Sequence, residues 1–90
     1  MTEVSDRLWK RIQRDFPAPG GADEAARLVS EANGSERVQA AIVLWAGGNL
    51  CRLRSGVALS AVDWRDVLVR GGLADEDWED RLDAELGPTR

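Results

Sequence analysis

The residues that could carry out chemistry in this sequence are mostly carboxylates near its C-terminus. General acid–base catalysis and calcium binding both use such groups, and six of them fall close together: Asp75, Glu76, Asp77, Glu79, Asp80 and Asp83. A calcium-binding EF-hand loop needs glycine at its sixth position and glutamate at its twelfth. Counted from Asp75, these positions hold Asp80 and Leu86. No spacing argument supports a catalytic pair either, so the sequence favours a solvated acidic face.

Nucleophilic and metal chemistry lack their usual partners. The chain has one cysteine, Cys51, and no histidine, which excludes an intrachain disulfide, the usual zinc ligand sets and the commonest activating base. A reactive thiol needs a neighbour that lowers its pKa, so Cys51 is predicted to be a small apolar packing residue. We therefore predict no catalytic residue, no metal site, no cofactor and no enzymatic activity.

The pattern Asp-Trp-x-Asp-x-Leu occurs twice, at residues 63–68 and again at 77–82. The simpler interpretation is helix-start chemistry, in which carboxylates satisfy free backbone N–H groups while each tryptophan is buried against the core. The alternative is a groove for a protein partner, lined by Trp64 and Trp78, because tryptophan flanked by charge is a common hot-spot arrangement.

Basic side chains gather on one face of the first predicted helix: Arg7, Lys10, Arg11 and Arg14. This face could bind a phosphate or an acidic partner, or be merely solvated. It could also pair with the acidic C-terminal helix, within the chain or across a homodimer. Surface ion pairs contribute only about 0.2–1 kcal/mol each, so such pairing would orient the helices more than stabilise them.

Apolar periodicity and turn signals predict helices throughout the chain, at about residues 3–15, 22–32, 36–46, 50–59, 64–70 and 76–86. The segment 36–46 is apolar nearly all round, which is typical of a central helix. We predict a single helical domain, residues 1–90, of the all-α class. Its fold is a compact orthogonal bundle of five to six short helices around the central apolar helix at 36–46. The core receives contributions from four tryptophans: Trp9, Trp45, Trp64 and Trp78.

Several local features refine this prediction. Glycine in the middle of a helix costs up to about 1 kcal/mol relative to alanine, so Gly56 predicts a close helix crossing. Arg54 falls at the edge of an apolar stripe, and if buried it would need Asp63 or Asp66 as a partner. Helix N-caps are assigned by residue type to Ser35, Asn49, Asp63 and Asp75.

Nucleic-acid binding has weaker support. The segment 36–59 has the spacing of a helix-turn-helix, yet Arg52 and Arg54 project about 160° apart on a helix and cannot both enter one groove. The net charge of −4 also discourages binding to a polyanion. No apolar run reaches the roughly 20 residues of a membrane span, and the N-terminus lacks the apolar segment of a signal peptide. A cytoplasmic protein is therefore expected.

The segments RVQAA, VDWRDVLV and GLADEDW followed by RLDAEL, with the Leu/Arg-rich helix before them, resemble a group of small uncharacterised actinobacterial proteins. The resemblance covers Ser35 to Leu86, implies an all-helical bacterial cytoplasmic domain, and carries no activity, cofactor or catalytic residue.

The functional prediction is a non-catalytic protein–protein interaction module that acts through a helical surface, with a homodimer as one form. The alternative is a nucleic-acid-binding domain that uses the basic face of the first helix or the segment 36–59. The candidate partner-binding residues are Arg7, Lys10, Arg11, Arg14, Trp64 and Trp78.

Overall fold

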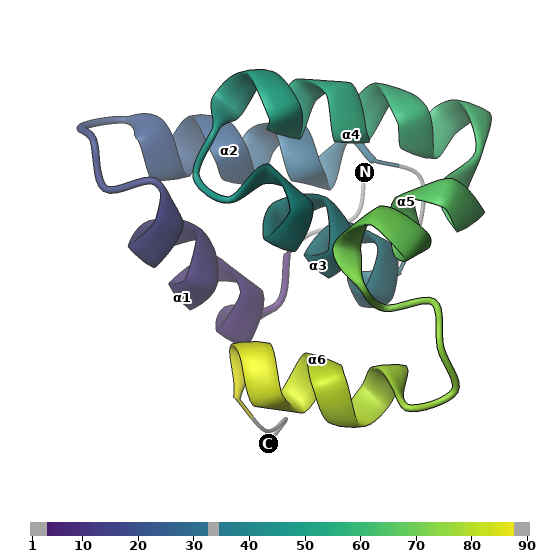
Figure 1. Cartoon of the computed structure of the whole chain (residues 1–90). Helices are drawn as coiled ribbons and strands as arrows, with labels where there is room; N and C mark the ends of the chain where they lie inside the picture. The colour runs from purple at the N-terminus through teal and green to yellow at the C-terminus, as the bar shows by residue number, and fades with distance from the viewer. Residues whose placement is uncertain (1–3, 33–34, 88–90) are drawn as a thin grey trace.

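A computed structural model describes residues 4–32 and 35–87 of the chain (Figure 1). These residues contain six α-helices joined by loops and turns, and no strand. The predicted all-α class is confirmed. The helices are α1 (Asp6–Asp15), α2 (Gly21–Ser30), α3 (Glu36–Ala46), α4 (Leu50–Val62), α5 (Trp64–Gly71) and α6 (Trp78–Leu86).

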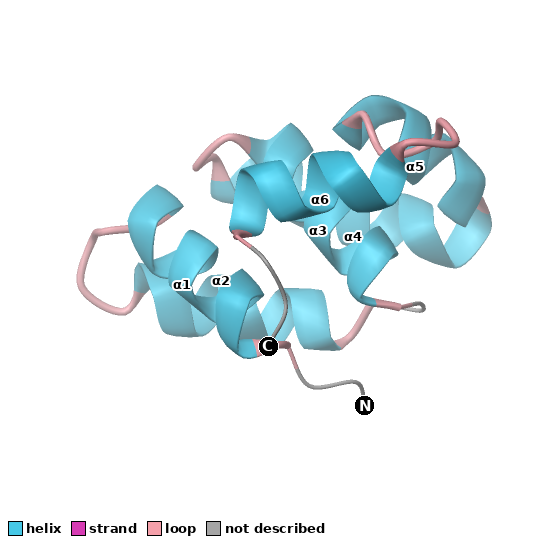
Figure 2. Cartoon of the chain, turned by 90° about the horizontal axis from the view of Figure 1, so that it is seen from below, coloured by secondary structure: helices cyan, strands magenta, loops and turns pink. Residues whose placement is uncertain are grey.

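The helix α3 is the centre of the fold, and its predicted bounds are confirmed to the residue. It packs against α1, α2, α4 and α5. Seven of its residues are buried, including Gln39, and Ile42 is inaccessible to solvent. Because a helix apolar nearly all round cannot present a polar face to water, the other helices must enclose it. Figure 1 shows α4 and α6 on opposite sides of α3, and in Figure 2, seen from below, α6 lies in front of α3.

Two glycines let helices approach α3 closely. A Cβ on Gly56 in α4 would lie 3.0 Å from Ile42 Cγ2, which confirms the predicted close crossing. A Cβ on Gly71 in α5 would lie 2.5 Å from both Cα and O of Ala41. In the sequence Gly71 directly follows the helix predicted at 64–70, where glycine is expected as a helix stop. It is instead the residue that allows α5 to rest on the backbone of α3.

Several predicted helix ends are wrong because side-chain hydrogen bonds or turns decide them. Ser5 caps α1 by accepting a hydrogen bond from the Leu8 backbone N–H, so the helix begins at Asp6 and not at residue 3, which lies outside the described residues. The helix α4 continues to Val62, where Asp63 ends it and caps α5. The helix α2 covers Gly21–Ser30 instead of 22–32, and the stop signal at 33–34 also lies outside the described residues.

Three of the four predicted N-cap positions are confirmed and one is wrong. Asn49 accepts a hydrogen bond from the Arg52 backbone N–H, and Asp63 accepts from the first turn of α5. Ser35 occupies the N-cap position of α3 but makes no capping hydrogen bond. Asp75 lies in a turn before α6, whose first residue is Trp78.

The four tryptophans do not share one environment. Trp9 and Trp78 are partly buried against the core, as predicted. Trp45 is partly buried and lies beside Gly56 at the α3–α4 crossing. Trp64 is 45% exposed, so the prediction that it belongs to the core is wrong. None of the helices described here is long and apolar enough to cross a membrane.

Candidate functional site

The basic face of α1 is largely engaged within the chain. Arg7 is only 13% exposed and binds Glu36 with two hydrogen bonds, from Nη2 to Oε1 at 2.6 Å and from Nε to Oε2 at 2.9 Å. Its Nη1 also donates to Asp83 Oδ1 at 2.6 Å and to the Gly87 carbonyl at 2.8 Å. A planar guanidinium is suited to such bidentate binding. Arg7 therefore joins α1, α3 and α6.

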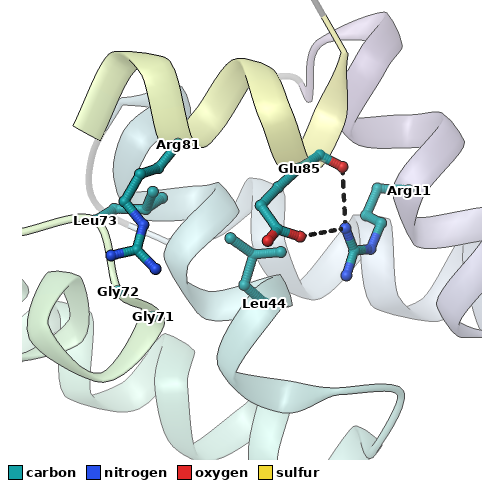
Figure 3. A pocket seen from close by; sticks show the side chains of 7 residues that line it. All are labelled: Arg11, Leu44, Gly71, Gly72, Leu73, Arg81 and Glu85. Atoms are coloured by element: carbon teal, nitrogen blue, oxygen red, sulfur yellow. Dashed lines mark hydrogen bonds and ion pairs between the residues drawn. The ribbon is translucent and has the colours of Figure 1, made fainter. Parts of the chain in front are cut away.

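A second arginine makes the same kind of link one turn later. Arg11 donates from Nε to Asp15 Oδ2 at 3.0 Å, and from Nη1 to both Oε2 and the carbonyl of Glu85 (Figure 3). Lys10 and Arg14 are exposed and pair with no other described residue. Of the alternatives left open by the sequence, pairing with the acidic C-terminal helix within the chain is thus the one seen for Arg7 and Arg11.

The network around Glu36 shifts the protonation equilibria of its members. Hydrogen bonds from the Arg7 guanidinium, supported by the Ser5 hydroxyl, hold the pKa of the Glu36 carboxyl below its usual value against the opposing effect of burial. The same contact raises the pKa of Arg7. Glu36 is therefore ionised in the folded chain at neutral pH.

A pH dependence of stability follows for this carboxylate. Its pKa is lower in the folded state than in the unfolded state, where it is about 4.3, so its contribution is complete above that pH and is lost as the pH falls through the folded pKa. We expect Glu36→Gln to lower the free energy of unfolding by about 1–2 kcal/mol at pH 7, as for a charged hydrogen bond. Urea unfolding of both proteins at pH 7 and below pH 4 should show this difference shrinking in acid. A difference that stays constant with pH would contradict the assignment.

The second tryptophan of the repeated pattern is covered by the chain itself. The Arg37 guanidinium lies over the Trp78 ring at 4.5 Å, and its Nε donates to the Leu73 carbonyl at 2.9 Å. Leu82, one turn further along α6, is buried. Trp78 thus helps to dock α6 and is partly buried, whereas Trp64 is 45% exposed. The acidic residues around it are mostly exposed, and the described residues contain no cluster of His, Cys, Asp or Glu that could hold a metal ion.

A small cavity of about 240 Å³ lies where α6 crosses the end of α5 (Figure 3). The ion pair between Arg11 and Glu85, a further arginine, two leucines and two glycines line it: Arg11, Leu44, Gly71, Gly72, Leu73, Arg81 and Glu85. Arg81 reaches from α6 toward Gly72, while Glu85 is bound to Arg11. The lining residues offer no nucleophile beside a base, so this cavity does not assemble a reaction centre of the usual acyl-transfer type.

The exposed large hydrophobic side chains lie at the end of α4 and in α5. The described chain exposes three large hydrophobic side chains, and all lie within eight residues: Val62 at 85%, Trp64 at 45% and Val69 at 65%. We call these three side chains, together with Arg52, Arg65 and Arg70 of the same two helices, the α4–α5 surface. Single exposed apolar residues need no explanation, but their concentration in one segment marks a candidate interaction site.

Arginines of the α4–α5 surface are stacked on tryptophan rings. Arg65 lies over Trp64 at 5.4 Å from the ring centroid, and Trp45 is flanked by Arg52 at 4.9 Å and Arg70 at 5.4 Å. Arg70 also donates from Nε to Asp66 Oδ2 at 3.0 Å. These stacks were not predicted from the sequence. The only local signal is the adjacency of Trp64 and Arg65, since Trp45 meets its arginines through the tertiary fold.

Two further expectations for α4 are wrong. Arg54 is exposed and contacts Glu24 of α2 at 3.5 Å, in place of Asp63 or Asp66. Cys51 is exposed and does not pack in the core. Both residues are exposed, whereas Leu53, Gly56 and Ser60 form the buried side of α4.

Comparison of the chain with protein-family models, curated proteins and solved structures found no match. The resemblance of Ser35–Leu86 to actinobacterial proteins therefore stays a prediction.

Proposed function

We propose that this chain is a non-catalytic protein-interaction module whose partner-binding site is the α4–α5 surface. The observation that carries the proposal is the concentration of exposed Val62, Trp64 and Val69 in one segment, while the other large apolar side chains of the described residues are buried or partly buried. Large apolar groups exposed together lose contact with water when a partner covers them, at roughly 25 cal/mol per Å². Tryptophan is also among the residues most often found at interface hot spots.

Charge selects the kind of partner. Residues 50–71 contain four arginines and two aspartates, whereas residues 74–87 contain seven acidic residues and one arginine. An acidic, apolar segment of another protein complements the α4–α5 surface. A second copy of the chain would place arginines against arginines if it used the same surface, since a two-fold interface brings identical patches together. We therefore favour an acidic partner over a homodimer.

The same geometry argues against the nucleic-acid alternative. A nucleic acid on the basic face of α1 would have to bind Arg7 and Arg11. Arg7 is already bound to Glu36 and Asp83, and Arg11 to Asp15 and Glu85. A polyanion would also meet a chain of net charge −4. We place the protein in the cytoplasm, a proposal supported by the exposed unpaired thiol of Cys51, which suits a reducing compartment.

Affinity capture with matched baits tests the proposed function. Wild-type chain, a Val62→Ser/Val69→Ser variant and a Trp64→Ala variant are used to capture proteins from a lysate of the source organism. The control bait, Ala84→Ser, changes an exposed residue of α6 on the opposite side. We expect a protein that binds wild type and control, and binds Trp64→Ala at least about 30-fold more weakly, as for a hot-spot residue. Equal binding by all four baits would contradict the proposal.

A further inference from the structure

We infer that Arg52 and Arg65 are the carboxylate-binding residues of the α4–α5 surface and that they recognise an acidic peptide segment of the partner. The inference rests on the proposed function, because it assigns the charged part of the same site. It adds the chemical class of the partner and the residues that select it.

Stacking on tryptophan prepares these two guanidiniums for binding. The Arg52 guanidinium lies over Trp45 and that of Arg65 over Trp64. A guanidinium held over a ring points its N–H groups outward along its edges, where they match the two oxygens of a carboxylate. The stack also limits side-chain rotation, so less conformational entropy is lost when a ligand binds.

Neither arginine has a carboxylate partner within the described part of the chain. Their neighbour Arg70 binds Asp66, and Arg54 on the same helix contacts Glu24. Arg7, by contrast, is bound to a carboxylate, because it donates two hydrogen bonds to Glu36. Arg52 and Arg65 thus keep the donor groups that Arg7 uses, on the two helices that carry the exposed apolar residues.

The position of these groups sets the length of the peptide. Arg52 lies in the first turn of α4 and Val62 at its last residue. Ten residues of helix span about 15 Å. A helical peptide of about 10 residues, or an extended one of about five, covers that distance. A segment of this length that carries carboxylates beside apolar side chains would reach from Arg52 to Val62, which is close in sequence to Arg65.

A carboxylate suits this surface better than the phosphates of a nucleic acid. The exposed Val62 and Val69 of the same two helices offer a contact to aliphatic side chains and none to a sugar–phosphate backbone. Partial desolvation by those apolar neighbours strengthens a charge pair relative to one in open water.

Peptide selection against the full-length chain tests the inference. Random 16-residue peptides displayed on phage are selected on the wild type, and the strongest binders are synthesised. We expect the selected peptides to carry Asp or Glu beside large apolar residues. Titration should show Arg52→Gln and Arg65→Gln each weakening binding about five- to fiftyfold, with Arg52→Lys also weaker because lysine lacks the planar fork. The control is Arg14→Gln, an exposed arginine of α1, which should change affinity less than about twofold.

The outcomes separate this inference from the proposed function. Thermal unfolding first establishes that each variant is folded. Two results would overturn the carboxylate assignment: selected peptides without net negative charge, or peptides that bind both Arg→Gln variants as tightly as wild type. The proposed function would still stand if binding of the partner requires Trp64. The same holds if no peptide binds while lysate capture depends on Trp64. Binding of a 20-nucleotide single strand that is lost in Arg52→Gln, with no peptide bound, would overturn both.

Discussion

Gly71→Ala is expected to lower the free energy of unfolding by about 3 kcal/mol or more. The added Cβ would lie 2.5 Å from Cα and O of Ala41, and these are backbone atoms that cannot rotate away. The helices α3 and α5 would have to move apart, and overpacking of this kind costs typically 1–3 kcal/mol and sometimes more. A 90-residue domain has a total stability of roughly 5–13 kcal/mol. Urea denaturation followed by circular dichroism should therefore show a midpoint far below that of the wild type.

Two other glycines calibrate that measurement. At Gly21 a Cβ would make only ordinary contacts, the nearest 3.4 Å from the Phe16 carbonyl oxygen, so Gly21→Ala should be neutral or stabilising by up to about 1 kcal/mol. Gly56→Ala should fall between the two, because the Ile42 side chain at 3.0 Å can shift slightly. Equal midpoints for Gly71→Ala and Gly21→Ala would mean that α5 does not rest on the α3 backbone as described.

These glycines show how far the sequence determines the fold. The bounds of α3 could be predicted because an apolar run, a preceding polar residue and the Gly47–Gly48 turn are all local features. Gly56 could be interpreted because it interrupts a helical pattern. Gly71 stands at a helix end, where glycine is expected on other grounds. Its tight contact with Ala41, thirty residues earlier, has no local signal.

The candidate site was only partly predictable for the same reason. Trp64 and Trp78 have nearly identical local sequences, yet Arg37 of α3 covers Trp78 while Trp64 stays half-exposed at the end of α4. Arg7 and Arg11 were correctly grouped with the acidic C-terminal helix as one alternative, because opposite charges on amphipathic helices attract. The arginine–tryptophan stacks on Trp45 join three helices, and no spacing in one helix reveals them.

Arg7→Met should produce the other large loss, about 2–3 kcal/mol of unfolding free energy. Methionine keeps much of the aliphatic volume but removes the hydrogen bonds to Glu36, Asp83 and the Gly87 carbonyl. Hydrogen bonds to charged groups contribute roughly 1.5–3 kcal/mol each when buried. The Asp83 contact adds less, because that carboxylate is half-exposed and screened by solvent. Arg14→Met, at an exposed position of the same helix, should change stability by less than about 0.5 kcal/mol.

Hydrogen exchange tells whether this loss is global or confined to α6. In the described structure α6 packs chiefly on α1, where Arg7 and Arg11 bind Asp83 and Glu85, whereas α3 is enclosed by four helices. We expect Arg7→Met to speed exchange of α6 amides more than that of α3 amides, because an outer helix held by polar contacts can open without the core. Combining it with Glu36→Gln isolates the ion pair, since a double-mutant cycle should give less than additive losses. Fully additive losses, with equal exchange in both helices, would mean that Arg7 contributes through packing alone.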